Sequence, residues 1–172
     1  QVLGTPDDAV YFRSYRNDEV GGDDDGPSSG AASGDFGGLV FREDSDREDD
    51  GIFLNWVSHA DINNGGGKVT VNSTEEPFAP IHMITARPTV VFSTITNSAA
   101  AAISADPDSF EDTPGRVGPD VHGNRVIDNS INGLFIRIAT DFGSPVDSLD
   151  VSARWDDTDI VHVVTESLLI NG

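Results

Sequence analysis

The sequence predicts an all-β domain, an antiparallel β-sandwich with long acidic loops. Apolar and polar residues alternate with a period of two along several segments, which is typical of half-buried strands. These segments are rich in β-branched and aromatic residues, and clusters of Gly, Asn, Asp and Pro separate them. Because no helical periods lie between the strands, the pattern favours a sandwich, a barrel or a jelly roll. The chain of 172 residues fits a single domain, 1–172.

Nine segments have this strand pattern. The clearest is 148–155, where Leu149, Val151 and Trp155 fall on one face. The predicted strands are 9–16, 38–43, 51–57, 68–72, 80–86, 88–96, 133–140, 148–155 and 159–170. Only 97–105 (NSAAAAISA) is predicted as a short helix, with a surface loop as the alternative. No internal repeat of fixed period is apparent, which disfavours a solenoid or a propeller.

Two long connections are predicted, at 17–37 and 105–124. The first contains VGGDDDGPSSGAASGDFGG, in which Gly and Ser give flexibility, the Asp run gives hydration and nothing offers an apolar anchor. We therefore expect 17–37 to be a flexible, solvent-facing acidic loop. Loops as long as these in a compact domain are usually functional or mobile.

Charge is the strongest compositional signal. The chain has 30 acidic and 10 basic residues, with 23 Asp against 7 Glu and nine Arg against one Lys, for a net charge of −20. Molar salt shortens the Debye length to about 3 Å and removes most of the resulting repulsion, so the composition is typical of halophilic proteins. Disorder is the rival interpretation, and the periodic apolar residues disfavour it.

The same charge restricts the partners of the chain. An acidic surface without a basic patch repels nucleic acid and anionic lipid headgroups. The longest small-apolar run, 99–103, is far too short for a spanning helix, and no signal-peptide core occurs in the first 30 residues. There is no cysteine to form disulfides or thiolate metal sites. The chain starts at Gln1, which indicates either a trimmed end or a removed leader.

Two motifs match catalytic or metal-binding patterns in part. GPSSG at 26–30 has the form of a nucleophile elbow around Ser28, but an Asp run precedes it where a buried strand is needed, so a linker is favoured. Asp46, Glu48 and Asp50 occupy the first ligand positions of a calcium loop, although Val57 stands where the bidentate Glu belongs. These three carboxylates are weak metal candidates, and a solvated acidic turn is the alternative.

The remaining polar candidates are scattered. His59, His82, His122 and His162 lack metal-ligand spacing, and a structural role is favoured for the two in strands, His82 and His162. The adjacent Ser, His and Asp of SHAD at 58–61 carry little weight, because triads are assembled in space. Asn72 in NST is a candidate glycosylation site. No catalytic residue and no cofactor site is predicted.

An acidic, cysteine-free, all-β domain with long hydrated loops resembles the single jelly-roll capsid proteins of icosahedral, internal-membrane-containing viruses of halophilic archaea. The resemblance covers the whole chain through size, composition and strand pattern, without a motif. It implies a virion protein in a high-salt extracellular setting, with no catalytic residues, in ring-shaped oligomers with copies of itself or a second capsid protein. These would lie near a membrane without inserting into it.

In that arrangement, sheet edges and loops would meet neighbouring subunits. Five arginines are candidates for bridging to the carboxylates of partners: Arg13, Arg16, Arg42, Arg47 and Arg116. The alternative function is a halophilic cell-surface or carbohydrate-binding β-sandwich module, which a row of exposed aromatic residues would indicate. A secreted hydrolase is the third class, and it would need a pocket with converging carboxylates or histidines of perturbed pKa.

Overall fold

The chain winds into a parallel β-solenoid whose coils stack on one another. The computed structural model describes residues 1–22, 30–71, 73–138 and 147–171. In this part of the chain, four coils each contribute three strands. The first coil has β1 (Val2–Leu3), β2 (Val10–Phe12) and β3 (Leu39–Arg42); the second has β4 (Trp56–Ser58), β5 (Ala60–Asn63) and β8 (Ile81–Ile84); the third has β9 (Thr89–Val91), β10 (Thr94–Thr96) and β11 (Ala101–Ala105); the fourth has β14 (Asp120–His122), β15 (Arg125–Ile127) and β16 (Ile131–Ile136).

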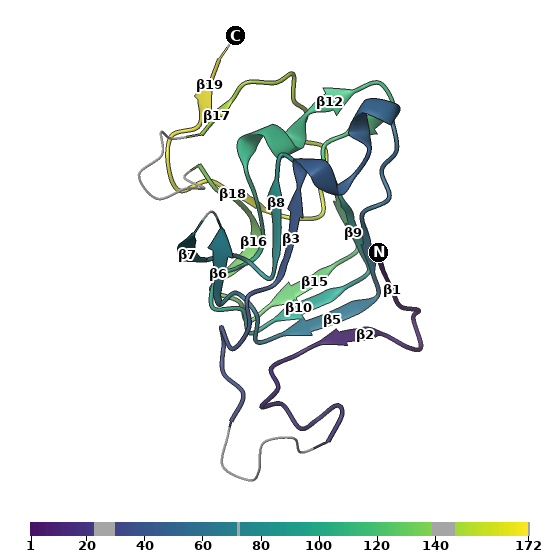
Figure 1. Cartoon of the computed structure of the whole chain (residues 1–172), viewed down its shortest axis with the longest axis vertical. Coiled ribbons are helices and arrows are strands. Elements are labelled where there is room, and N and C mark those ends of the chain that lie inside the picture. The colour runs from purple at the N-terminus through teal and green to yellow at the C-terminus, as the bar shows by residue number, and fades with distance from the viewer. Residues whose placement is uncertain (23–29, 72, 139–146, 172) are drawn as a thin grey trace.

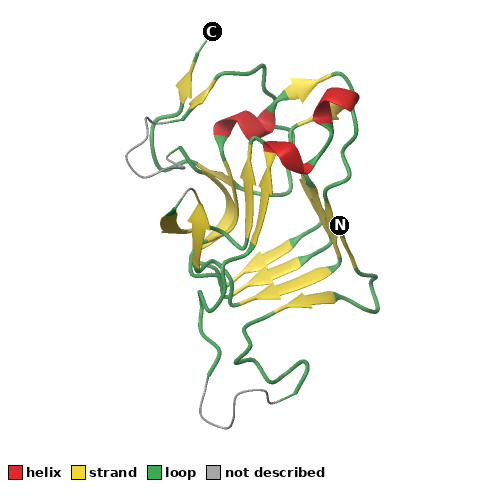
Figure 2. Ribbon diagram, in the orientation of Figure 1, coloured by secondary structure: helices red, strands yellow, loops and turns green. Residues whose placement is uncertain are grey.

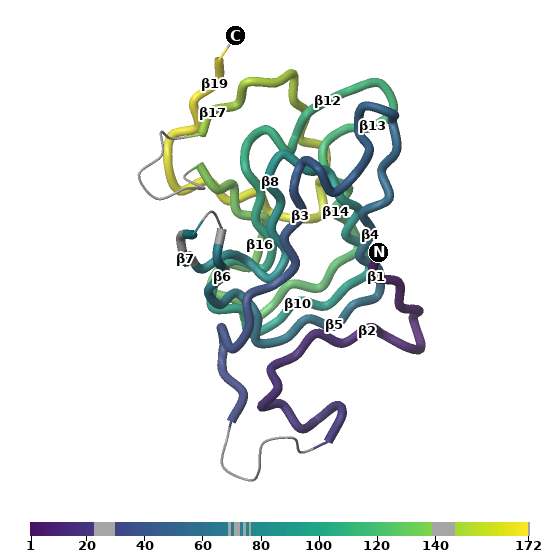
Figure 3. The backbone as a smooth tube through the Cα atoms, viewed as in Figure 1, coloured from purple at the N-terminus to yellow at the C-terminus, as the bar shows by residue number. Residues whose placement is uncertain are grey.

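Corresponding strands of successive coils pair to form three sheets (Figure 1). The first sheet has the order β1-β4-β9-β14, and the second has the order β15-β10-β5-β2. The third sheet, β18-β16-β11-β8-β3, gains a fifth strand from β18 (His162–Val163). Every pairing within these sheets is parallel. The backbone trace in Figure 3 makes the stacking of the coils visible.

Apolar residues in equivalent positions of each coil form the core between the sheets. Val57, Val90 and Val121 are in register across the first sheet and are fully buried. The second sheet aligns Ile62, Ile95 and Val126, and the third aligns Ile81, Ile103 and Leu134. Equivalent positions recur at intervals of roughly 30 residues in the last two coils, which is the range of known solenoid repeats. Each coil therefore buries its apolar face against its neighbours.

The corners between the sheets are built from residues in the left-handed backbone region. Between the first and second sheets, His59, Phe92 and Gly123 have φ values of 51°, 51° and 65°. After the second sheet, Asn64, Asn97 and Asp128 have φ values of 71°, 54° and 56°. Asn and Gly tolerate this region best. The same turn therefore recurs in coil after coil and keeps the strands in register.

Asparagine side chains tie the corners of the fourth coil to those of the third. Asn124 accepts a hydrogen bond from the Ser93 N–H at 2.9 Å and donates to the Val90 carbonyl at 2.7 Å. Asn129 accepts from the Ser98 N–H at 3.0 Å and donates to the Ile95 carbonyl at 2.9 Å. Backbone groups that the turn would leave unpaired are thus satisfied.

Several short elements lie outside the three sheets of the solenoid. Two antiparallel hairpins project from it, β6 (Lys68–Val71) with β7 (Thr74–Pro77), and β12 (Asp112–Thr113) with β13 (Arg116–Val117). Strand β17 (Ser148–Leu149) pairs with β19 (Leu169–Ile170). The short 3-10 helices η1 (Glu43–Ser45), η2 (Glu48–Asp50) and η3 (Pro107–Phe110) gather at one end of the view, away from β2, β5, β10 and β15 (Figure 2).

The predicted antiparallel sandwich, and with it the jelly roll, is wrong, although the all-β class is correct. Period-two alternation shows that one face of a strand is buried, but it does not give strand direction. A solenoid wall also has one buried and one outer face, so it produces the same pattern. The solenoid that we disfavoured is the observed fold.

Several predicted elements also change. The single strand expected at 88–96 is two strands, β9 and β10, separated by the left-handed corner at Phe92. The helix expected at 97–105 is wrong, since it contains β11, whose five residues are all buried. The helix propensity of alanine does not determine the local structure here, because these residues are buried in the core of the solenoid. The structure divides 105–124, expected as one long loop, among η3, β12, β13 and β14.

Candidate functional site

The outer faces of the three sheets differ in how far other segments cover them. On the third sheet, the outward-facing His82 is fully buried beneath Phe78, with ring centroids 4.2 Å apart. On the first sheet, Arg116 covers Thr89, whose hydroxyl accepts a hydrogen bond from Nη2 at 3.1 Å. On the second sheet, no outward-facing residue of β5, β10 or β15 is buried. The second sheet therefore presents the least covered face of the solenoid.

We call this surface the open face. It consists of Tyr11, Asp61, Asn63, Thr94, Thr96, Arg125 and Ile127. Tyr11, Asp61, Thr94 and Arg125 form one row in register across four strands, a span of about 14 Å at the usual strand spacing. The face thus combines an aromatic ring, hydroxyls, an amide and charged groups in one flat array.

An aromatic row follows the corner beside the open face. We call it the corner ladder, and it consists of His59, Phe92 and His122, one from each of three successive coils. The Phe92 ring centroid lies 5.4 Å from each imidazole, tilted by 33° to His59 and edge-on to His122. Phe92 is 54% exposed. Its ring lies over Gly123, where a Cβ atom would come within 2.7 Å of it, so the glycine makes room for the ring.

Charge on the open face is nearly balanced, in contrast to the chain as a whole. Asp61 accepts a hydrogen bond from Arg13 at 2.8 Å, and Arg13 also contacts Glu19 at 2.8 Å. The other charged residue of the face, Arg125, is exposed. Exposed carboxylates, which are abundant in the chain as a whole, are therefore scarce on the open face.

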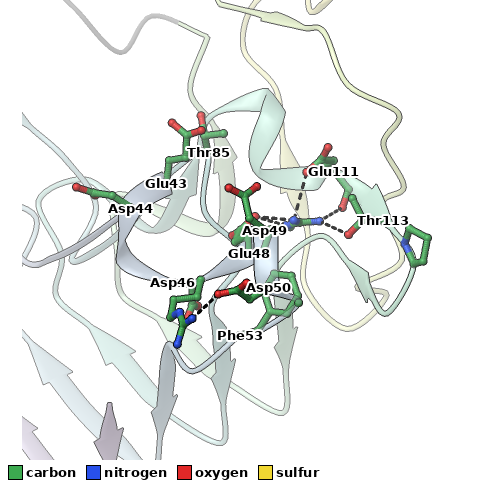
Figure 4. Close-up of a pocket in the computed structure, with 14 residues that line it drawn as sticks. Glu43, Asp44, Asp46, Glu48, Asp49, Asp50, Phe53, Thr85, Glu111 and Thr113 are labelled. Atoms are coloured by element: carbon green, nitrogen blue, oxygen red, sulfur yellow. Dashed lines mark hydrogen bonds and ion pairs between the residues drawn. The ribbon is translucent and has the colours of Figure 1, made fainter.

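An acidic hollow lies elsewhere, at the end of the solenoid that carries η1 and η2. It has a volume of about 840 Å³ and is lined chiefly by acidic residues (Figure 4). Figure 4 shows Glu48, Asp49 and Asp50 between Glu43 and Asp44 on one side and Glu111 and Thr113 on the other. Such a lining repels anions and attracts cations.

Arg87 organises the base of this hollow. Its side chain is only 4% exposed and donates to Glu48 from Nε at 3.0 Å and from Nη2 at 2.5 Å. It also contacts the Glu111 carboxylate at 3.2 Å and donates to the Thr113 hydroxyl at 2.9 Å. The guanidinium carbon lies 4.9 Å from the centre of the Phe53 ring. Arg87 thus pins η2 and the β12 segment to the solenoid.

The predicted metal candidates Asp46, Glu48 and Asp50 all line this hollow, but each carboxylate serves a different local contact. Asp46 accepts the Leu54 and Asn55 N–H groups at 2.6 and 3.1 Å, and Asp50 pairs with Arg47. Within the part of the chain that the structure describes, no three His, Cys, Asp or Glu side chains are grouped to hold a metal ion.

The five arginines predicted to bridge subunits are all engaged within the chain. Arg13 binds Asp61 and Glu19, Arg16 contacts Asp35 at 3.8 Å, and Arg42 contacts Asp44 at 3.9 Å. Arg47 pairs with Asp50, and Arg116 donates to the Arg87 carbonyl at 2.7 Å.

The histidines predicted as structural lie apart from one another. Burial, followed by the charge of Arg137, lowers the pKa of His82 to about 3, so this imidazole is neutral. Its Nδ1 lies 2.8 Å from the Ser104 hydroxyl. His162 stacks on Trp155 at 5.3 Å, and burial lowers its pKa. His59 and His122 belong instead to the corner ladder. Ser28 and Asn72 lie outside the described residues.

A second, open hollow of about 490 Å³ lies at the free edge of β14. Here Asp157 accepts the Val121 N–H at 2.9 Å and Asp159 accepts the Gly123 N–H at 2.6 Å. Burial, reinforced by the nearby Asp120, raises the pKa of Asp157 to about 6. Both carboxylates take the place of a further strand by accepting hydrogen bonds from the edge.

The fold and these surfaces define a parallel β-solenoid with one open, mixed polar and aromatic face. No family model, no curated protein and no solved structure matches the chain. Among the described residues, no helix is long and apolar enough to span a membrane.

Sequence reasoning found neither the open face nor the corner ladder. The outward positions could be identified from alternation in ADIN and STIT, at 60–63 and 93–96. Alternation does not reveal which outer face other segments cover. The ladder unites residues from three coils, so recognising it required the repeat that we did not detect.

Proposed function

We propose that the protein is a salt-adapted surface module that binds a polysaccharide along the open face. The observation that carries this proposal is the absence of buried outward residues in β5, β10 and β15, beside an exposed aromatic ladder. An uncovered array of this kind is where a soluble protein is expected to meet a partner. The proposal includes no chemical reaction.

The chemistry of the face suits an extended carbohydrate. Sugar rings present apolar C–H faces that pack on aromatic rings such as Tyr11 and Phe92, which are 47% and 54% exposed. Their hydroxyls can exchange hydrogen bonds with Thr94, Thr96 and Asn63. A flat face crossing four strands contacts several units of a polymer at once, whereas a small ligand is expected to need a deeper, more apolar pocket.

The composition supports a high-salt setting for this binding. The net charge of −20 keeps most of the surface hydrated where salt strengthens apolar association. On the open face, the carboxylate of Asp61 is paired with Arg13.

Binding should be measured by affinity electrophoresis and calorimetry in 3 M KCl against a panel of neutral and charged polysaccharides. Phe92→Asn keeps a residue that tolerates the left-handed corner, and it should weaken binding about tenfold by removing the ring. Trp56→Ala is the matched control, because Trp56 is 40% exposed on the outer side of the first sheet. Failure of every polysaccharide to bind, or an equal loss in both variants, would contradict the proposal.

A structural subunit of a salt-adapted shell is the second candidate function. The described residues form no sandwich and so none of the edges predicted for that role, but β1, β2 and β3 are edge strands at one end of the solenoid. Leu3 and Tyr11 on these edges are 60% and 47% exposed. Copies of the chain could add strands there. Discrete rings in sedimentation at 3 M KCl would favour this role, and monomers at both 0.1 and 3 M would argue against it.

A further inference from the structure

Arg125 differs from the other basic residues of the chain. Of ten basic side chains, it alone has no hydrogen bond or ion pair within the described part of the structure. Unpaired surface arginines are ordinary in proteins of balanced charge. Here acidic residues outnumber basic ones three to one, so an arginine that remains without a carboxylate partner is unusual.

Arg125 also occupies a defined position. It lies in β15, in register with Thr94, at the end of the row that begins with Tyr11 and Asp61. Asp61 forms an ion pair with Arg13 at 2.8 Å, and Arg13 also pairs with Glu19. Among the charged side chains of the open face, Arg125 is therefore the one without an ion-pair partner in the described residues, and it lies at one end of the central row.

Resting on the proposed function, we infer that the open face selects polysaccharides that carry carboxylate or sulfate groups, and that Arg125 binds these groups. A guanidinium presents paired donors that match the two oxygens of such an anion. Molar salt screens long-range attraction and also the repulsion from the other carboxylates of the chain. At this ionic strength, the short-range, directional hydrogen bonds of the planar guanidinium group remain effective.

Three polysaccharides that share the same sugar chain test this inference. Dextran, carboxymethyl-dextran and dextran sulfate are each titrated into the protein in 3 M KCl. We expect the charged forms to bind at least tenfold more tightly than dextran. Preference for carboxymethyl-dextran over dextran sulfate identifies carboxylate as the natural group, and the reverse preference identifies sulfate.

Arg125→Gln should lower the affinity for the charged forms about tenfold and leave that for dextran unchanged. Arg42→Gln is the matched control. It removes the same charge from an exposed arginine on the third sheet that contacts Asp44, and it should change affinity less than twofold.

Equal binding of all three dextrans would overturn the inference and leave the proposed function intact. An equal loss in the two variants would also overturn it, because the effect would then be one of net charge. If the charged dextrans do not bind, the inference fails. The proposed function fails as well only if the neutral members of the wider panel do not bind.

Discussion

The buried arginine at the base of the acidic hollow allows a quantitative test of how the peripheral segments are held. Replacing Arg87 with Met keeps most of the volume but leaves Glu48 and Glu111 without their cation. The Arg87 side chain is 4% exposed and that of Glu48 is 19% exposed, so the cation is buried and its partner is largely shielded from water. Removing one partner of such a pair costs about 3–5 kcal/mol.

This loss is a large share of the roughly 5–15 kcal/mol that stabilises a typical domain. For a chain of this size, it corresponds to a Tm lowered by about 6–20 °C. The assay is thermal unfolding followed by circular dichroism in 3 M KCl. Arg47→Met is the control, since its ion pair with Asp50 is 72% and 54% exposed and should contribute less than about 1 kcal/mol. Equal shifts in the two variants would refute the assignment of Arg87 as a pin.

Three further predictions concern the solenoid itself. Ile103→Ala empties a fully buried position of the third sheet and should cost about 2–5 kcal/mol in chemical unfolding, whereas Thr94→Ala on the open face should stay within about 0.5 kcal/mol. Gly123→Ala should lower the free energy of unfolding more than Gly51→Ala. Both glycines have a φ near 65°, but only a Cβ atom at position 123 would contact the Phe92 ring. Equal losses of unfolding free energy in the two variants would contradict this prediction. The pKa of Asp157 is raised to about 6 in the folded state, so this group favours folding at low pH and that contribution is lost as the pH rises through about 6. Asp157→Asn should flatten the gain in unfolding free energy seen between pH 7 and 5, and identical pH profiles would show that this carboxyl does not contribute.

The sequence predicted many of the strands and which face of a strand is buried, but not the parallel direction of the strands or the way in which they connect. Leu149, placed on the inner face of 148–155, is buried, since a buried face leaves a period of two, but β5 with Ile62 was not predicted as a strand. The turn at Phe92 was missed because a bulky residue with positive φ is uncommon, and nothing local indicates that stacking on Gly123 compensates for it.

The repeat was missed for a different reason. Only inward positions and corners recur, as in the Val57, Val90 and Val121 series. The β6–β7 hairpin lies between β5 and β8, so it lengthens the second coil relative to the third and disrupts a simple period. The metal candidates illustrate a further limit: Asp46, Glu48 and Asp50 line one hollow, but their spacing in sequence did not show that each accepts a different donor.

The stacking of coils makes the length of the open face a discrete, countable property. Each additional coil would lengthen the row from Tyr11 to Arg125 by about 4.8 Å without altering the strands already present. Insertions such as the β6–β7 hairpin leave this row untouched, because they emerge at a corner beyond it. Duplication of one coil would thus extend the binding surface by a fixed increment, and ligand length and loop content could evolve independently.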